Sequence, residues 1–354
     1  MSSSLIRETL LAVARGERVR ADVDGLAEAA ALEGMTGLLA RAATASDRRL
    51  TIQGVALEAR ASGMLHELAR VTRAFAEAGV AILSFKGPVL SQQLYGAAGM
   101  RASSDLDLVV APRDAAAGEA ILESLGYHEA EALNASQRRT HRRFGGASLF
   151  SADASGVPID FHWTFSNEQF PLRLSFDDAW QRRAEVRIGE ATFATLGDAD
   201  LVVTTCSHAA KHLWHRLEFL AQIAALAKRD CDWSAVERVA LEAGAAKQVG
   251  LSFLLVRELL GVPAPPLPRC LALAEPRLPE ARRLVEASLF RGEHRHGDAT
   301  ARYLLLLLDR RRDALRSLLL AVFVPTHSDW RGARGPHWLQ WLRRPLRLLL
   351  RTIR

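Results

Sequence analysis

The chain has 354 residues, of which 49% are hydrophobic and 24% are charged. These proportions are those of an ordinary globular protein and exclude a chain that is disordered throughout. The formal net charge of +6 is unevenly placed, because residues 331–354 hold seven arginines and no acidic residue, which leaves 39 basic and 40 acidic residues elsewhere. The basic surplus is thus a property of the C-terminal tail. It does not indicate a nucleic acid as the partner of the whole protein.

Cysteine usage and hydropathy bear on the cell compartment. The cysteines Cys206, Cys231 and Cys270 are far apart and form no C-x-x-C motif, which favours a reduced protein without disulfides or a structural zinc site. Arg7 and Glu8 interrupt the N-terminus before an apolar signal region develops. No apolar run reaches the roughly 18 residues of a membrane-spanning helix. We therefore expect a cytoplasmic protein.

Residues 1–79 are rich in Ala, Leu, Glu and Arg, and their apolar residues recur at spacings of three and four. This spacing predicts amphipathic helices that pack against the later part of the chain. Residues 80–196 change character, with short apolar runs separated by Gly, Pro and Asp. The elements expected there are, in order, a strand over 80–85, a helix from Pro88 to about Tyr95, a strand over 105–110, a helix from Pro112 to about Leu125, a hairpin of 144–151 with 157–163, and a second hairpin over 186–196.

From Asp198 onward the pattern is helical again. A long amphipathic helix is predicted over 199–228, and further helices over 234–260 and 277–324. Strands that alternate with helices and then with hairpins indicate an α+β fold, with a mixed β-sheet and helices on one side. The expected organisation is an N-terminal helical region (1–79), an α+β core (80–196), a C-terminal helical domain (197–330) and a basic amphipathic tail (331–354).

Three aspartates are candidates for a metal-binding site. Asp105 and Asp107 lie on a predicted strand, where residues two apart project to the same face. Asp160 lies within another apolar run, and a third carboxylate from a neighbouring strand would complete an oxygen-rich site for a hard divalent cation such as Mg²⁺. A lone D-x-D is also compatible with a turn or cap residue followed by an edge charge.

Several separated motifs occur in a characteristic order. They are L-S-F-K-G at 83–87, L-Y-G at 94–96, R-x-x-x-D-L-D-L-V-V at 101–110, L-G-Y at 125–127, I-D-F-H-W at 159–163, the helix at 208–220 and the late segment 325–347. Together they resemble the uncharacterised bacterial nucleotidyltransferase family of the DNA polymerase beta-like superfamily, and the resemblance covers most of residues 80–350. It implies a nucleotidyltransferase core over 80–196, flanked by helical regions on both sides.

The resemblance also implies an activity. Asp105 and Asp107 match the two metal-binding aspartates of the family, and Asp160 matches its third catalytic carboxylate. The protein would then use Mg²⁺ or Mn²⁺, in a two-metal mechanism, to move a nucleoside monophosphate from an NTP, with ATP as the first candidate. The acceptor would be a hydroxyl or phosphate of a small molecule, peptide or protein. Better-known members have Gly-Ser after the first strand, where this chain has Lys86-Gly87. This difference leaves an alternative, a catalytically weak protein that uses the fold for binding or as a scaffold in a biosynthetic complex.

Cationic and polar side chains are needed beside these carboxylates, because a nucleotide is itself anionic. Each candidate has a structural alternative: Lys86 could be a solvated loop charge, and Arg101 could simply pair with Asp105. The histidine pair on the helix at 208–216 lacks the glutamate of an H-E-x-x-H zinc site, and its helix face could be merely solvated. The candidates for binding nucleotide or substrate are Lys86, Gly87, Arg101, His208, Lys211 and His212, while Tyr95, Trp163 and Trp214 either stack on a base or pack in the core.

Two expectations concern geometry. If the strands are placed as argued, the carboxylates of Asp105, Asp107 and Asp160 converge at the mouth of a cleft and stay largely unpaired by Lys or Arg. Lys86 and the helix at 208–216 face the same cleft. The tail interleaves Trp and Leu with Arg and is interrupted by Pro345. That pattern is compatible with peripheral docking on the inner membrane surface or on an acidic partner, and also with a helix whose arginines extend over the protein's own surface.

Overall fold

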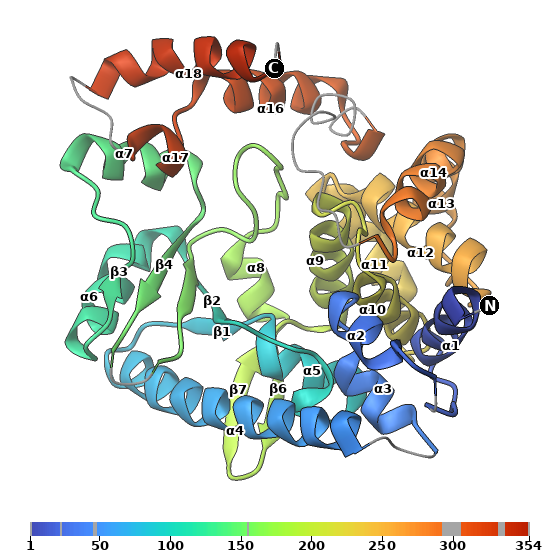
Figure 1. Cartoon of the computed structure of the whole chain (residues 1–354). Coiled ribbons are helices and arrows are strands. Elements are labelled where there is room, and N and C mark those ends of the chain that lie inside the picture. Colours follow the sequence, from blue (N-terminus) through green and yellow to red (C-terminus); the bar gives the residue numbers. More distant parts are fainter. Residues whose placement is uncertain are drawn as a thin grey trace.

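The computed structural model of the protein describes residues 2–21, 23–44, 48–153, 156–291, 306–331 and 337–352. The fold is α+β, as predicted: a five-stranded mixed sheet is flanked by helices from both ends of the chain (Figure 1). The sheet consists of β1 (Ile82–Ser84), β2 (Leu106–Val110), β3 (His128–Glu129), β4 (Ala147–Ser151) and β5 (Ile159–His162), and a separate hairpin consists of β6 (Ala184–Ile188) and β7 (Ala191–Thr195).

Helices dominate the remainder. Before and between the strands lie α1 (Ser2–Ala14), α2 (Leu26–Leu32), α3 (Thr36–Ala42), α4 (Arg48–Glu77), α5 (Gly87–Tyr95), α6 (Ala115–Ser124), α7 (Ala135–Phe144) and α8 (Phe176–Gln181). After the strands come α9 (Asp198–Lys211), α10 (Leu217–Ala227), α11 (Trp233–Ala243), α12 (Ala246–Leu260), α13 (Pro268–Ala274), α14 (Leu278–Ser288), α16 (Arg311–Phe323), α17 (His327–Trp330) and α18 (His337–Thr352).

The strand order in the sheet is β1-β2-β5-β4-β3. The β2–β5 pair at its centre is parallel, whereas β1 pairs with β2, and β4 with both β5 and β3, in antiparallel fashion. A parallel pair cannot be closed by a tight turn and needs a long crossover, which residues 111–158 supply here. This crossover brings two segments about fifty residues apart in the chain into direct register.

One face of the sheet is covered by α4 and α6. The side chains buried there come from alternate residues of β2 and β5, because successive residues of a strand point to opposite faces, and they pack against Leu68, Val71 and Phe75 of α4. Helix α6 approaches so closely that a Cβ added at Gly118 would lie 2.4 Å from the ring of Phe161. Hence this face is a packed core, and any polar chemistry of the sheet has to take place on its other face.

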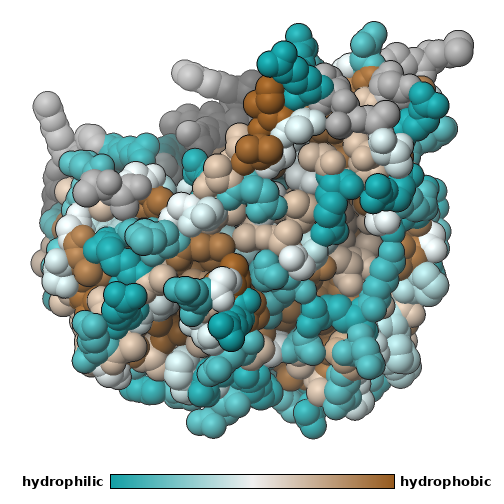
Figure 2. All heavy atoms as spheres, turned by 90° about the horizontal axis from the view of Figure 1, so that it is seen from below, coloured by the Kyte–Doolittle hydropathy of each residue, from teal (hydrophilic) through white to brown (hydrophobic). Residues whose placement is uncertain are grey.

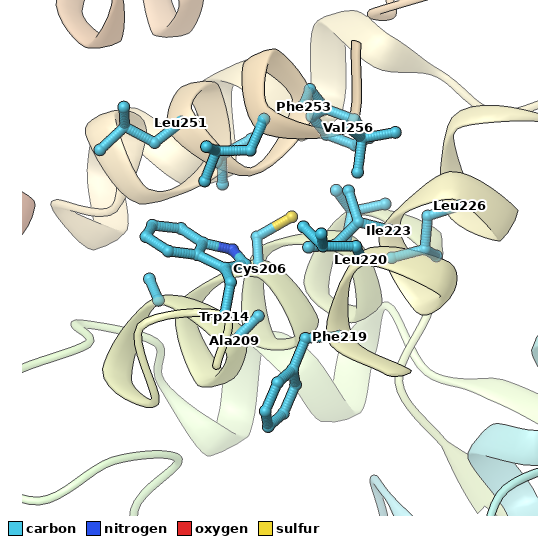
Figure 3. Close-up of a cluster of buried hydrophobic side chains, with 14 of the residues drawn as sticks. Cys206, Ala209, Trp214, Phe219, Leu220, Ile223, Leu226, Leu251, Phe253 and Val256 are labelled. Atoms are coloured by element: carbon cyan, nitrogen blue, oxygen red, sulfur yellow. The ribbon is translucent and has the colours of Figure 1, made fainter. Parts of the chain in front are cut away.

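A second and larger core joins the N-terminal helices α1–α3 to the C-terminal helices α9–α14. Figure 3 shows part of it, where Trp214 and Cys206 lie beneath the apolar face of α12. The Trp214 indole is 1% exposed, and its Nε1 donates a hydrogen bond of 3.0 Å to the Ser252 hydroxyl. Of the two roles open to Trp214, packing in the core is therefore the one the structure shows.

Several predicted elements differ from the observed ones. The single helix expected over 199–228 is wrong, because α9 ends at Lys211 and Leu213 and Trp214 adopt left-handed backbone conformations (φ of 55° and 46°) before α10 begins. The apolar pattern continues across this break, and the pattern alone therefore hides it. Residues 234–260 likewise divide into α11 and α12, at Gly244 with φ of 70°. Part of the 277–324 prediction falls on 292–305, outside the described residues.

The lower part of the molecule in Figure 1 is formed by α4 and by the β6–β7 hairpin, which reaches below it. Seen from below in Figure 2, this face is mostly hydrophilic, with smaller hydrophobic patches between the polar side chains. Exposed apolar residues of α4 include Ile52 and Val55. Among the described residues, no helix combines the length and the apolar character that crossing a membrane requires.

Candidate active site

The β2–β5 pairing places two of the three predicted aspartates side by side. In the parallel register Asp107 is the direct partner of Asp160, so both project from the same face of the sheet, opposite to α4 and α6. His162 lies two residues beyond Asp160 on the same strand and shares that face. Asp107, Asp160 and His162 each offer a ligand atom within 4.8 Å of the other two.

Lys86 lies over this group. It lies two residues after the end of β1, and its Nζ donates to Asp107 Oδ1 at 2.7 Å, with both side chains largely buried. The expectation that Lys and Arg leave the carboxylates unpaired is therefore wrong for Asp107. The pairing is physically sensible, because a buried carboxylate without a counter-charge is costly, and a lysine at the end of the neighbouring strand is within reach.

The same neighbours set the ionisation of Asp107 and His162. Burial by itself would raise the pKa of the Asp107 carboxyl, but the charge of Lys86 and the contact with His162 outweigh it and hold that pKa well below its usual range. Burial would lower the pKa of His162, but the charge of Asp160 and the contacts with both aspartates raise it. In this structure Asp107 is thus an anion that lies between the Lys86 ammonium and the His162 ring.

Asp105 lies one residue before β2 and outside this close group. It is half-buried, and its Oδ1 accepts a hydrogen bond of 3.0 Å from the Ser104 hydroxyl. Burial raises the pKa of the Asp105 carboxyl, and the negative charges of Asp107 and Asp160 raise it further. The charges of Asp107 and Asp160 therefore affect the ionisation of Asp105, although Asp105 is not one of the three residues whose ligand atoms lie within 4.8 Å of one another.

Helix α9 brings polar and basic side chains to the same face. Its last turn carries His208 and Lys211, and His212 caps its end. Burial and the nearby charge of Lys86 lower the pKa of His208 far enough to keep the ring neutral at pH 7. Lys211 is exposed, yet the protein around it reduces its hydration, and this effect together with Lys86 lowers the pKa of its ammonium. The rings of His208 and His212 both contact Phe219 of α10.

A cavity of about 610 Å³ opens in front of these groups. Asp107 does not line the cavity, whereas Lys86 and His162, which both contact it, do. Residues 324–327, 330 and 331 also line the cavity, among them His327 and Trp330 of α17. The residues of the site that line the cavity are Lys86, Asp160, His162, His208, Lys211 and His212.

The remaining candidates lie elsewhere. Arg101 is half-buried and does not line the 610 Å³ cavity; its Nη1 donates weakly to the Ser103 hydroxyl at 3.4 Å. Gly87 begins α5 with φ of 62°, a conformation that other residues rarely adopt, and fixes the backbone next to Lys86. The Trp163 indole is buried and donates to the Arg142 carbonyl at 3.1 Å. Tyr95 is half-buried beside Arg101 and does not line the cavity.

His162 is the site residue that the sequence reasoning missed. Its signal was present in I-D-F-H-W, because a histidine two residues after a candidate ligand on a strand must share its face. Its Nε2 is buried, lies 2.8 Å from Asp160 Oδ2 and 3.4 Å from Asp107 Oδ1, and makes no hydrogen bond of good geometry to either. Two carboxylates and such an imidazole are a donor set that fits a divalent cation, and the nitrogen ligand suits Mn²⁺ at least as well as Mg²⁺.

The chain matches the model of a known protein family. A family model described as an uncharacterised nucleotidyltransferase matches residues 10–261, more than two thirds of the chain. The matched range contains the whole sheet, the carboxylate group and α9. No curated protein matches the chain.

Proposed function

The chain belongs to this family of uncharacterised nucleotidyltransferases, and from this premise we propose that it transfers a nucleoside monophosphate from an NTP, with ATP as the first candidate, to a hydroxyl or phosphate of an acceptor. The acceptor would be a small molecule, a peptide or a protein. The observation that carries the proposal is the register that sets Asp107 beside Asp160 and His162 at one side of the 610 Å³ cavity.

The aspartates and His162 would have two roles in this reaction, metal binding and proton acceptance. A divalent cation held by Asp107, Asp160 and His162, with Asp105 as a further ligand for a second one, would supply Lewis-acid stabilisation of the charge that develops on the transferred phosphoryl group. Asp160 is the member of the group that reaches the cavity, where it can accept the proton of an acceptor hydroxyl. Asp107, deeper in the protein, can only bind and orient.

The cations around the cavity fit a triphosphate. Lys86 and Lys211 both line it, and the positive charge of Lys86 is one reason for the lowered pKa of the Lys211 ammonium. Two ammonium groups that repel one another across a cavity are stabilised by an anion between them. The neutral His208 ring beside them supplies hydrogen bonding without adding charge.

The test is a transfer assay. The full-length protein is incubated with each of the four labelled NTPs, Mg²⁺ or Mn²⁺ and a metabolite and peptide extract, and both pyrophosphate release and labelled product are measured. Asp160→Asn is expected to reduce transfer by about 100-fold or more, since it removes both a ligand and a proton acceptor. Asp230→Asn, at an exposed position outside the cavity lining, should leave the rate unchanged. Equal rates for the wild type and Asp160→Asn would refute the assignment.

The Lys86–Asp107 ion pair favours a second candidate, a protein that keeps the fold for binding or as a scaffold. In such a protein the ammonium of Lys86 would replace the metal at Asp107 permanently. Titration with Mn²⁺, followed by electron paramagnetic resonance, separates the two candidates. Binding that is lost in Asp160→Asn supports the enzyme, whereas the absence of any binding together with the absence of transfer supports the scaffold.

A further inference from the structure

The outermost layer of the molecule is formed by the C-terminal helices. Helix α18 runs along the upper edge in Figure 1 with no other element drawn above it, and it packs against α16. The inner side of α18 is anchored by Arg344, which is buried and donates to the Ala321 carbonyl of α16 at 2.9 Å and to Asp329 at 2.5 Å. Arg344 therefore has a structural role, because it attaches α18 to α16 and to Asp329.

The outer side of α18 is apolar. Leu342 and Leu346 are 65% and 59% exposed. Each lies two residues from Arg344 and hence about 200° around the helix from the anchored side. Helix α16 carries a second exposed stripe at a spacing of four residues, formed by Leu315, Leu319 and Phe323, which are 59%, 50% and 47% exposed. Large exposed apolar residues grouped in this way mark an interaction surface more often than scattered ones do.

The segment that carries these stripes is strongly basic. Residues 310–354 contain eleven arginines and two aspartates, a net charge of +9, while the rest of the chain carries 35 basic and 38 acidic residues. Both aspartates are engaged within the fold: Asp313 pairs with Arg173 at 2.5 Å, and Asp329 pairs with Arg344 and Arg347. The layer therefore combines an apolar outer stripe with a large surplus of positive charge.

We propose that this layer docks on an anionic lipid bilayer, with α18 in the plane of the interface and Leu342 and Leu346 inserted among the lipid chains. An amphipathic helix rich in arginine, with large apolar residues on its other side, has the properties of interfacial membrane helices. Charge decides against a second copy of the chain as the occupant. A symmetric dimer would bring two strongly basic segments together, whereas an anionic surface attracts them.

The experiment uses the full-length protein with vesicles of phosphatidylcholine alone and of equimolar phosphatidylcholine and phosphatidylglycerol, in a flotation assay. The test variant is Leu342→Ser/Leu346→Ser, and the matched control is Ile52→Ser/Val55→Ser, two residues of α4 that are 58% and 64% exposed. Because all four positions face solvent, each variant should unfold at the wild-type temperature. We expect binding to the anionic vesicles only, weaker at high salt, about tenfold weaker in the test variant and unchanged in the control.

Three results would overturn the proposal. No binding of the wild type to the anionic vesicles would exclude docking. Binding that is equal in the test variant and the wild type would exclude insertion of the leucines and indicate a purely electrostatic contact, as for an acidic protein. Self-association that disappears in the test variant, without vesicle binding, would identify a second copy as the occupant. None of these results depends on nucleotidyl transfer, and the two proposals can therefore fail separately.

Discussion

Replacing Lys86 with methionine removes the ammonium from Asp107 while keeping an aliphatic side chain of similar length. Both members of the pair are largely buried, with 17% and 8% of their side chains exposed, so solvent screening is weak. Removing one member of a buried pair costs about 3–5 kcal/mol, because the other charge stays behind without its partner. Here Asp107 would face Asp105 and Asp160 with only His162 to balance it.

This loss can be converted into a melting temperature. With an unfolding entropy of about 2.1 cal/mol/K per residue, a chain of 354 residues should lose about 4–7 °C on Lys86→Met when EDTA is present. A bound divalent cation should restore much of this, since saturation at 100 times its dissociation constant adds about 2.7 kcal/mol. Mn²⁺ should also bind the variant about tenfold or more tightly than the wild type, because two unit charges 4 Å apart at an effective dielectric constant of about 20 repel by about 4 kcal/mol.

The assay is thermal unfolding by circular dichroism, in EDTA and across a Mn²⁺ series. Lys228→Met is the control, since that exposed ammonium lies outside the cavity lining and donates to the Arg15 carbonyl. Two outcomes would refute the reasoning. An unchanged melting temperature in EDTA would mean that the ion pair contributes nothing to stability. An equal stabilisation of the wild type and the variant by Mn²⁺ would mean that Lys86 and the cation do not compete for Asp107.

Three further predictions concern the cavity, the helical core and the C-terminal layer. Lys211→Ala should weaken ATP binding in calorimetry by about tenfold, because an ammonium that faces the cavity is lost, whereas Arg238→Ala, on the exposed side of α11, should not; equal affinities would return α9 to a structural role. Trp214→Phe should lower the free energy of unfolding in urea by about 2 kcal/mol, since the Ser252 hydroxyl loses its partner and a void is left; an unchanged midpoint contradicts this. Burial opposes a low pKa for Asp329, but hydrogen bonds from Thr326 and the charge of Arg344 outweigh it, so this pKa lies below the unfolded value of about 3.9. The contribution of Asp329 to stability is therefore complete above that pH and is lost as the pH falls through it towards the folded pKa. The acid-induced change in tryptophan fluorescence that reports this loss should be absent in Asp329→Asn.

Much of the secondary structure was readable from local chemistry. Pro88 at the start of α5 and Gly96 at its end bound that helix correctly, because both residues act on the backbone at their own position. The hairpin through Gly189 was predicted for the same reason, since its turn has a positive φ and few residues besides glycine adopt that conformation. The α+β class and the nucleotidyltransferase family followed from the order of such elements and motifs.

Local patterns also have clear limits. The break after Lys211 was missed because the apolar spacing of α9 continues into α10, while the left-handed residues between them, Leu213 and Trp214, are ones that normally avoid this conformation. That conformation is held by packing, in which the Trp214 indole is buried beneath α12. No propensity of the segment itself would have indicated a turn there.

By itself, the sequence determined that Asp107 and Asp160 lie within short apolar runs typical of strands, and it predicted from their spacing that Asp105 and Asp107 project together. The same spacing joins His162 to Asp160, but that signal was not used. The sequence could not determine which strands pair or in which register, because that depends on the crossover of residues 111–158 and on the core it closes. Only the tertiary structure decided that Asp107 meets Asp160 while Asp105 stays at the edge, and that Lys86 neutralises Asp107. The physical reason is the range of the interactions. Backbone preferences act over a few residues, whereas the free-energy cost of burying a charge depends on which opposite charge the completed fold brings near it.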